Sequence, residues 1–369
     1  MQTDVAPRVP AFTAGGVSPR RRAVARAILI LTTIALVVVL VLQIAYSAGW
    51  TDTGFGSWRP VALAVLFWFV AIDVGVVLLR GVRGERALFL LPAVELTFAF
   101  VIFPTIFGIY IAFTDWNLSA VSGRHFNGLD NFRRLVHDGD YWRVIGNNFK
   151  YLIGVLIQYV IAFGLALLLN QNIRGRKFFR VVFLLPFMLS PVAIGWMIGR
   201  SILDAQYGVV TPLLAKIGFE DVSFFDQPFP AFLGIMAMDA WYSIPFIMVL
   251  LLAGLQALPH EVFEASRIDG ATAWQTFRHM TFPLLLPVSL TAIVLRAVFE
   301  FKLIDIVRVV TNGGPGESTD TATNFIYREG IEKTNVGYAT ALSQVFLIIV
   351  ILFVAFVLVT IGRKVRDVA

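Results

Sequence analysis

The sequence predicts an all-α integral membrane protein with eight transmembrane helices. Of its 369 residues, 58% are hydrophobic and only 15% are charged, whereas a soluble globular domain carries about 25% charged residues. The mean hydropathy is +0.78. Eight segments have the roughly 20 mostly apolar residues that a membrane-spanning helix needs.

These eight segments follow one another along the chain and are separated by more polar loops. The predicted spans are residues 27–47, 61–79, 87–113, 150–170, 179–203, 231–255, 284–304 and 338–361. Several of them contain proline, which lacks a backbone N–H and kinks a helix, a defect that neighbouring helices in a bundle tolerate. The prolines concerned are Pro92, Pro104, Pro186, Pro191 and Pro245.

Basic residues predict the side of the membrane on which each loop lies, because short loops rich in Lys and Arg stay in the cytoplasm. Basic clusters at residues 20–26, 80–86, 174–180 and 363–366 all fall on one side of an eight-span arrangement. Both termini are therefore expected in the cytoplasm, with residues 1–26 as a cytoplasmic tail. A cleaved signal peptide is the less favoured alternative, since the first apolar stretch is longer than the roughly 7–15 residues of a signal sequence.

Residue types needed for several kinds of chemistry are missing. The chain has no cysteine, which excludes disulfides, thiolate metal sites and thiol nucleophiles. Its four histidines form no helical metal pair, and neither common nucleotide-binding glycine loop is present. We expect no metal, no cofactor and no enzyme activity in this chain. If the chain takes part in transport, the energy must come from another protein.

One predicted cytoplasmic loop, between spans six and seven, carries an excess of acidic residues. Its pattern indicates two short helices separated by a break. Pro259 suits a first helical turn, and Glu261 favours its positive end. Gly270 is a typical helix terminator, and Thr272 with Gln275 resembles a capping box that opens the second helix. A loop that stays inside despite its charge is expected to have a function there.

This loop resembles the EAA loop of binding-protein-dependent ABC importer permeases. The family pattern is E-A-A, three residues, G, nine residues and I-x-L-P. Here Glu264-Ala265-Ser266 precedes Gly270 by three residues, and Met280-Thr281-Phe282-Pro283 follows after nine. Over about residues 87–369, further motifs resemble the carbohydrate branch of the family, as do two extra N-terminal spans typical of the larger maltose-importer subunit. These motifs are IFGIYIAFTDWN, FNGLDNFRRL, LLPFMLSPVAIGWM, WYSIPF and VTNGGPG.

The resemblance implies a type I importer permease fold with a six-helix core at residues 87–369, preceded by two extra helices at residues 27–79. It also implies that residues 259–283 form a coupling loop that docks on an ATPase, with Glu264, Ala265, Gly270 and Pro283 at the motif positions. Implied partners are a second homologous permease, two cytoplasmic ATPase subunits that bind ATP and Mg, and an extracytoplasmic solute-binding protein. The expected location is the inner membrane of a bacterium or archaeon.

The resemblance further implies import of a sugar or sugar-like solute by alternating access. The solute is expected near the bilayer midplane between spans five, six and seven, because aromatic faces and nearby polar groups suit sugars. The candidate pathway residues are Phe187, Trp241, Tyr242, Phe299, Glu300, Lys302, Asn324 and Tyr327.

We single out five of the ionisable residues within predicted spans, where a charge is costly unless it faces protein or water. They are Asp73, Glu95, Asp239, Arg296 and Glu300. Glu300 is four residues from Arg296 and can neutralise it, with Asp239 as an alternative partner. Structural and functional roles both stay open for these residues. An ion-coupled secondary transporter that uses Asp239 and Glu300 as a relay is the main alternative function.

Overall fold

The computed structural model describes residues 18–47, 51–80, 82–121, 123–218 and 222–366, and apart from one isolated bridge their regular structure is helical. Within these ranges seven helices are long and apolar enough to cross a membrane, and a sharply bent helix pair raises the number to eight. All eight predicted spans have a counterpart among them. The chain divides into two compact units, residues 1–107 and 108–369.

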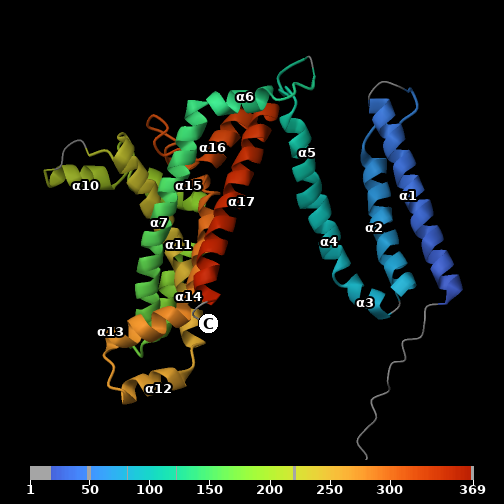
Figure 1. Cartoon of the computed structure of the whole chain (residues 1–369). Coiled ribbons are helices and arrows are strands. Elements are labelled where there is room, and N and C mark those ends of the chain that lie inside the picture. The colour runs from blue at the N-terminus through green and yellow to red at the C-terminus, as the bar shows by residue number, and fades with distance from the viewer. Residues whose placement is uncertain (1–17, 48–50, 81, 122, 219–221, 367–369) are drawn as a thin grey trace, which may run out of the picture. The chain divides into compact units, whose positions relative to one another are not determined.

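The first unit contains two long helices, α1 (Pro19–Ser47) and α2 (Arg59–Arg80), which pack against each other (Figure 1). The Trp68 indole donates a 2.9 Å hydrogen bond to Thr33 Oγ1. Gly75 allows close approach, because a Cβ there would lie 2.9 Å from Leu29. Since α1 begins at Pro19, the last part of the predicted tail is helical; residues 1–17 lie outside the described ranges.

The third span is an interrupted helix from Gly84 to Ala112. It comprises most of α3 (Val82–Leu88), then α4 (Leu91–Thr97), the π-helix η1 (Phe98–Ile102) and α5 (Phe103–Ala112). Pro104 cannot donate to the carbonyl four residues earlier, which accounts for the wide π turn before it. The two compact units divide inside this span, whereas the family core is predicted to begin at residue 87. That family boundary stays a prediction.

The second unit is built on α7 (Gly139–Asn170), α11 (Pro228–Gln256), α14 (Phe282–Glu300) and α17 (Val336–Arg366), as Figure 1 shows. Where α7, α11 and α14 meet, an apolar cluster excludes solvent completely from Ala162, Met248, Leu251 and Leu285. Small residues let the helices approach: a Cβ on Gly254 would lie 2.9 Å from Leu285. This cluster fixes the helices that carry the candidate site.

The predicted span at residues 179–203 is not one helix. The chain runs from α8 (Arg176–Leu184) through the 3-10 turn η2 (Pro186–Met188) to α9 (Pro191–Ile194) and the π-helix η3 (Gly195–Arg200). The two halves are bent by 93°. The residue before a proline avoids the helical region, and Ser190 before Pro191 is extended with ψ of 137°. The bend leaves Phe187 at the break between the two halves.

Shorter helices connect the long ones. They are α6 (Asp130–His137), α10 (Val210–Lys216), α12 (His260–Ile268), α13 (Ala273–Thr276), the π-helix η4 (Phe277–Thr281), α15 (Asp305–Val310), α16 (Ala322–Tyr327) and the π-helix η5 (Arg328–Glu332). The π-helix η4 lies just before Pro283, the same arrangement as η1 before Pro104.

Candidate functional site

A cavity of about 340 Å³ opens between the bend of the fifth span, α11 and α14. Four residues of α11 face it at the i, i+3, i+4 and i+7 positions that share one side of a helix: Asp239, Tyr242, Ser243 and Phe246. The α14 helix and the segment after it contribute Arg296, Phe299 and residues 302–306. The helix period thus brings aromatic and charged side chains to one cavity.

Aromatic rings form one wall of this cavity. The Phe187 ring lies 5.4 Å from that of Tyr242 and is stacked on Phe246 at 5.6 Å, measured between ring centroids. Phe246 in turn meets Phe299 edge-on at 5.8 Å. Rings in contact with each other have restricted motion, so they present a preformed apolar surface. Such a surface suits the C–H face of a sugar ring.

A buried ionic cluster supplies charged groups to the lining, through Asp239 and Arg296. Arg296 contacts the carboxylates of both Asp239 and Glu300, and all three residues are at most 4% exposed. Gln158 on α7 completes the cluster, since its Nε2 donates to Asp239 at 2.8 Å and its Oε1 accepts from Arg296 Nε at 3.0 Å. Ser243 donates to Asp239 at 3.4 Å. Arg296 therefore contacts both of the carboxylates that the sequence analysis names as its possible partners, Glu300 and Asp239.

The predicted pathway residues divide into two groups. Phe187, Tyr242, Phe299 and Lys302 line the cavity. Glu300 does not line the cavity but contacts Arg296, which does. Trp241, next to Tyr242 on α11, does not line the cavity either, and its side chain is 41% exposed. The cavity also includes residues absent from the predicted set. Phe246 was present in the WYSIPF motif, and its spacing of four from Tyr242 could have identified it.

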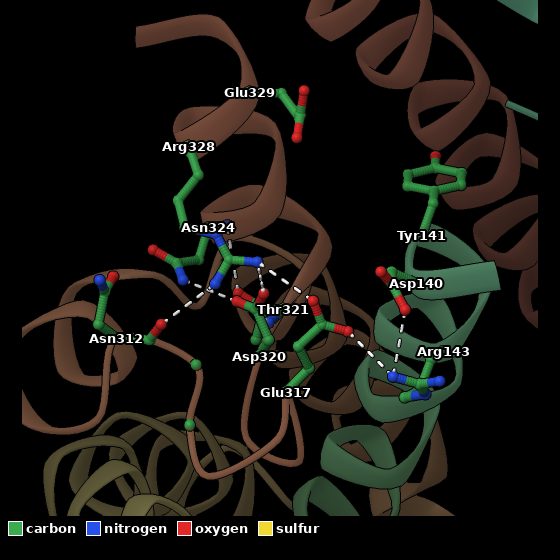
Figure 2. A network of polar contacts seen from close by, with 12 residues as sticks. Asp140, Tyr141, Arg143, Asn312, Glu317, Asp320, Thr321, Asn324, Arg328 and Glu329 are labelled. Atoms are coloured by element: carbon green, nitrogen blue, oxygen red, sulfur yellow. Dashed lines mark hydrogen bonds and ion pairs between the residues drawn. The ribbon is translucent and has the colours of Figure 1, made fainter. Parts of the chain in front are cut away.

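Asn324 and Tyr327 do not line this cavity, and their part in the solute pathway stays a prediction. Asn324 is fully buried in a separate polar network, where its Nδ2 donates to Asp320 at 2.7 Å (Figure 2). The Tyr327 ring instead packs under the Arg308 guanidinium, 4.0 Å away. The Thr321 cap at the start of α16 fixes this arrangement, because its hydroxyl accepts from the Asn324 N–H.

The network around Asp320 holds the loop that carries the VTNGGPG motif (Figure 2). Arg328 pairs with Asp320 at 2.7 Å and donates to the Asn312 carbonyl at 3.2 Å. Arg143 on α7 pairs with Glu317 at 3.2 Å. Burial raises the pKa of the Asp320 carboxyl, although Asn324 and Arg328 act in the opposite direction. This network therefore stabilises a loop and contributes nothing to the cavity lining described above.

The loop between α11 and α14 has the predicted structure of helix, break and second helix. The α12 helix ends before Gly270, whose φ is +70°, a conformation that glycine adopts without strain. Thr272 and Gln275 form a complete capping box at the start of α13. Glu264 and Ala265 are exposed, and Pro283 is half-buried at the start of α14. The acidic motif position is thus free to contact a partner.

The comparisons with known proteins agree with this arrangement. Residues 158–366 match the family described as binding-protein-dependent transport system inner membrane component. The chain belongs to this family. It is accordingly a multi-pass membrane component of a transport system and not an enzyme with its own ATPase site. The match gives no support to an ion-coupled secondary transporter.

Several relatives in this permease family cover most of the chain. A probable ABC transporter permease protein of Pyrococcus horikoshii is 34% identical over 72% of this chain and 92% of its own length. The trehalose/maltose transport system permease protein MalF of Thermococcus litoralis is 30% identical, over 76% and 94% respectively. The sulfoquinovosyl glycerol transport system permease protein SmoG of Agrobacterium fabrum is 31% identical, over 72% and 86%.

The permease fold is also found in solved structures. A chain of a bacterial ABC transporter involved in the import of the acidic polysaccharide alginate superposes with a TM-score of 0.66 at 23% identity, covering 76% of this chain and 96% of that one. A chain of a bacterial alginate ABC transporter in complex with an alginate pentasaccharide-bound periplasmic protein gives a TM-score of 0.65 at 22% identity, covering 77% of this chain and 96% of that one. These similarities establish a type I importer permease fold.

Proposed function

We propose that this permease is a transmembrane subunit of an ATP-driven ABC importer for a sugar or sugar-like solute, working by alternating access. The observation that carries the proposal is the cavity lined by both aromatic rings and polar groups. Aromatic faces bind the apolar side of a sugar, and directed hydrogen bonds bind its hydroxyls. The relatives named for trehalose/maltose and sulfoquinovosyl glycerol support the same class of solute.

The coupling role is assigned to residues 259–283, with Glu264, Ala265, Gly270 and Pro283 as the motif positions. Exposure of Glu264 and the compact turn at Gly270 support this role, because a docking element must protrude and hold its shape. The proposed assembly contains a second homologous permease, two cytoplasmic ATPase subunits that bind ATP and Mg, and an extracytoplasmic solute-binding protein. The alginate transporter solved with its periplasmic protein supports the last partner.

The cavity is tested by replacing one lining aromatic and one neighbour that does not line it. Tyr242→Ala should lower uptake of the cognate sugar into proteoliposomes at least tenfold, because it removes both a ring face and a hydroxyl. Trp241→Ala, next to it on the chain but outside the lining, should leave uptake within about twofold. Tyr242→Phe, which keeps the ring, reports on the hydroxyl alone.

The uptake rates of the three variants are compared only where each variant assembles equally with the ATPase subunits. Equal loss of uptake in Tyr242→Ala and Trp241→Ala, with assembly intact, would contradict the assignment of this cavity. Uptake driven by an ion gradient without ATP would contradict the proposed energy source.

A further inference from the structure

A second, larger cavity lies beside the loop that contains α12 and α13. Its volume is about 1320 Å³, and it is bounded by the end of α7, by α8, by the end of α11, and by the α12–η4 segment. All these elements belong to the second unit. None of its lining residues is shared with the cavity between the bend of the fifth span, α11 and α14.

The charge of this cavity is of one sign. Arg176 and Arg180 line it from α8 and Arg267 lines it from α12, together with His260. No Asp or Glu is among the described residues that line it. No ion pair joins any of the three arginines to an acidic group in the described part of the chain. The acidic residues of α12 therefore do not neutralise the positive charge of this cavity.

Arg176 and Arg180 are held in place by a neutral group. They are four residues apart and so share one face of α8. In the orientation that satisfies both, the Gln256 carboxamide oxygen accepts from Nη2 of Arg176 at 2.9 Å and of Arg180 at 2.6 Å. The Nε atoms of both arginines are enclosed and have no acceptor among the described residues. Two partly buried guanidinium groups are therefore positioned together without an anion to balance them, which is costly unless a ligand supplies one.

The rest of the wall is apolar. Leu167, Leu255, Leu258 and Phe263 line the cavity beside the arginines, and α7 and α11 end here, at Asn170 and Gln256. A cavity at the ends of membrane-spanning helices with a cationic side and an apolar side matches an amphiphilic anion. Guanidinium groups bind phosphate oxygens through paired, charge-assisted hydrogen bonds.

We infer that this cavity is a binding site for a phosphate group, supplied by an anionic phospholipid headgroup or by a soluble phosphorylated compound, with Arg176, Arg180 and Arg267 as its ligands. The inference rests on the proposed cytoplasmic side of residues 256–281. It is distinct from the proposed transport cavity and from the exposed Glu264 position. A bound phosphate would bridge α8, on the bent span, to α12, on the proposed coupling loop.

The test compares two variants with the same loss of charge. Arg176→Gln/Arg180→Gln removes the two α8 ligands, and Arg174→Gln/Lys177→Gln removes two neighbouring basic residues that do not line the cavity. The purified full-length complex is placed in nanodiscs of phosphatidylcholine with a minor fraction of phosphatidylglycerol, and the retained lipid is counted by native mass spectrometry. The matched control should retain phosphatidylglycerol like the wild type, and the cavity variant should lose it by at least about tenfold in affinity.

A second arm identifies the source of the phosphate. Inorganic phosphate and glycerol phosphate are titrated by calorimetry into complex held in phosphatidylcholine alone. The source is soluble if the wild type binds one of these compounds, the cavity variant does not, and the wild type retains no phosphatidylglycerol in the first arm. Arg267→Gln, at an exposed lining residue of α12, repeats both arms in case the double variant does not fold. Equal lipid and phosphate binding by the wild type and both cavity variants, or an acidic ATPase side chain seated between the arginines in the complex, overturns the inference. Neither arm requires transport, so a failed import assay leaves these outcomes unchanged.

Discussion

At the scale of single residues, Gly270 is the position at which backbone conformation and the proposed coupling role coincide. Its φ is +70°, and a Cβ added there would meet nothing within 4 Å, so only the backbone conformation opposes a larger residue. Gly128, in the loop after the third span, has a φ of +63° and the same open surroundings. A valine at either position should cost the fold a similar amount, about 1–2 kcal/mol.

This equivalence makes Gly128→Val the control for Gly270→Val. We expect both variants to insert and to lose similar thermal stability, but only Gly270→Val to weaken association with the ATPase subunit, because it displaces Glu264 and α13 relative to each other. Co-purification of the ATPase with each variant measures the difference. Equal recovery of the ATPase with both would show that the turn at Gly270 has no part in docking.

The buried cluster around Arg296 supports a second residue-scale prediction. One arginine faces two carboxylates, so Glu300→Gln leaves a neutral Arg296–Asp239 pair, whereas Arg296→Gln leaves two buried carboxylates without a cation. Breaking a buried pair by removing one partner costs roughly 3–5 kcal/mol. Arg296→Gln should therefore sharply reduce the amount of monodisperse complex in size-exclusion chromatography, and Glu300→Gln should not.

Arg133→Gln, which breaks only the exposed Arg133–Asp130 pair, is the control. It should leave assembly unchanged, because a surface pair contributes at most about 1 kcal/mol. Normal assembly of Arg296→Gln would show that the two carboxylates do not need the cation. A loss of uptake in Glu300→Gln with normal assembly would assign Glu300 a role in transport beyond its contact with Arg296.

At the scale of elements, the loop at residues 311–321 is attached to the start of α7. Asn147 Nδ2 donates to the carbonyls of Glu317 at 2.8 Å and Asp320 at 3.2 Å, and the Tyr151 hydroxyl donates to Thr319 at 3.0 Å. Asn147→Ala removes the buried hydrogen bond to the Asp320 carbonyl, while the Glu317 carbonyl keeps the Asp320 N–H as a donor, and should cost about 1–3 kcal/mol. Asp140→Ala, which breaks only an exposed pair with Arg143, should cost less than about 1 kcal/mol. Equal shifts in the thermal unfolding midpoint of the two variants would contradict this attachment.

The elements also show what sequence reasoning could and could not find. Capping signals are local, so the two helices around Gly270 and the capping box at Thr272 were predictable from a few neighbouring residues. The 93° bend of the fifth span was indicated by Pro186 and Pro191, but its size depends on packing against α11 and α15. The burial of Asn324 beside Asp320 could not be predicted, because it depends on contacts with Asp320 and Arg328 in a loop with irregular backbone, and no periodic pattern reports on such contacts.

At the scale of the whole chain, the spans were predictable because apolar runs and basic clusters are properties of sequence alone. The cavity was predictable in part: the aromatic motif WYSIPF supplied Tyr242, but the position of Asp239 and Arg296 on its wall required the packing of α11 against α14. Contacts inside the second unit bring together loops that are predicted to lie on the same side of the membrane, and which side that is stays a prediction. Two loops predicted outside are joined by Asn117 and Asn335, whose side chains are 2.7 Å apart, and two predicted inside share the basic cavity.

Sidedness itself is the last prediction, and the lack of native cysteine makes it direct to test. Cysteines at Gly128, Gly218 or Gly316 would be strained, because these glycines have positive φ, so exposed residues with ordinary backbone elsewhere in the same loops are better probes. Single cysteines at Val121, Asn172, Ile217, Ile268 and Ile331 should react with a membrane-impermeant maleimide from outside, inside, outside, inside and outside in that order. Reaction in intact cells identifies the outside set, and reaction only after permeabilisation identifies the inside set. Labelling of Ile268 in intact cells would place α12 outside, where no ATPase could reach Glu264, and both the coupling role and the cytoplasmic phosphate site would then be wrong.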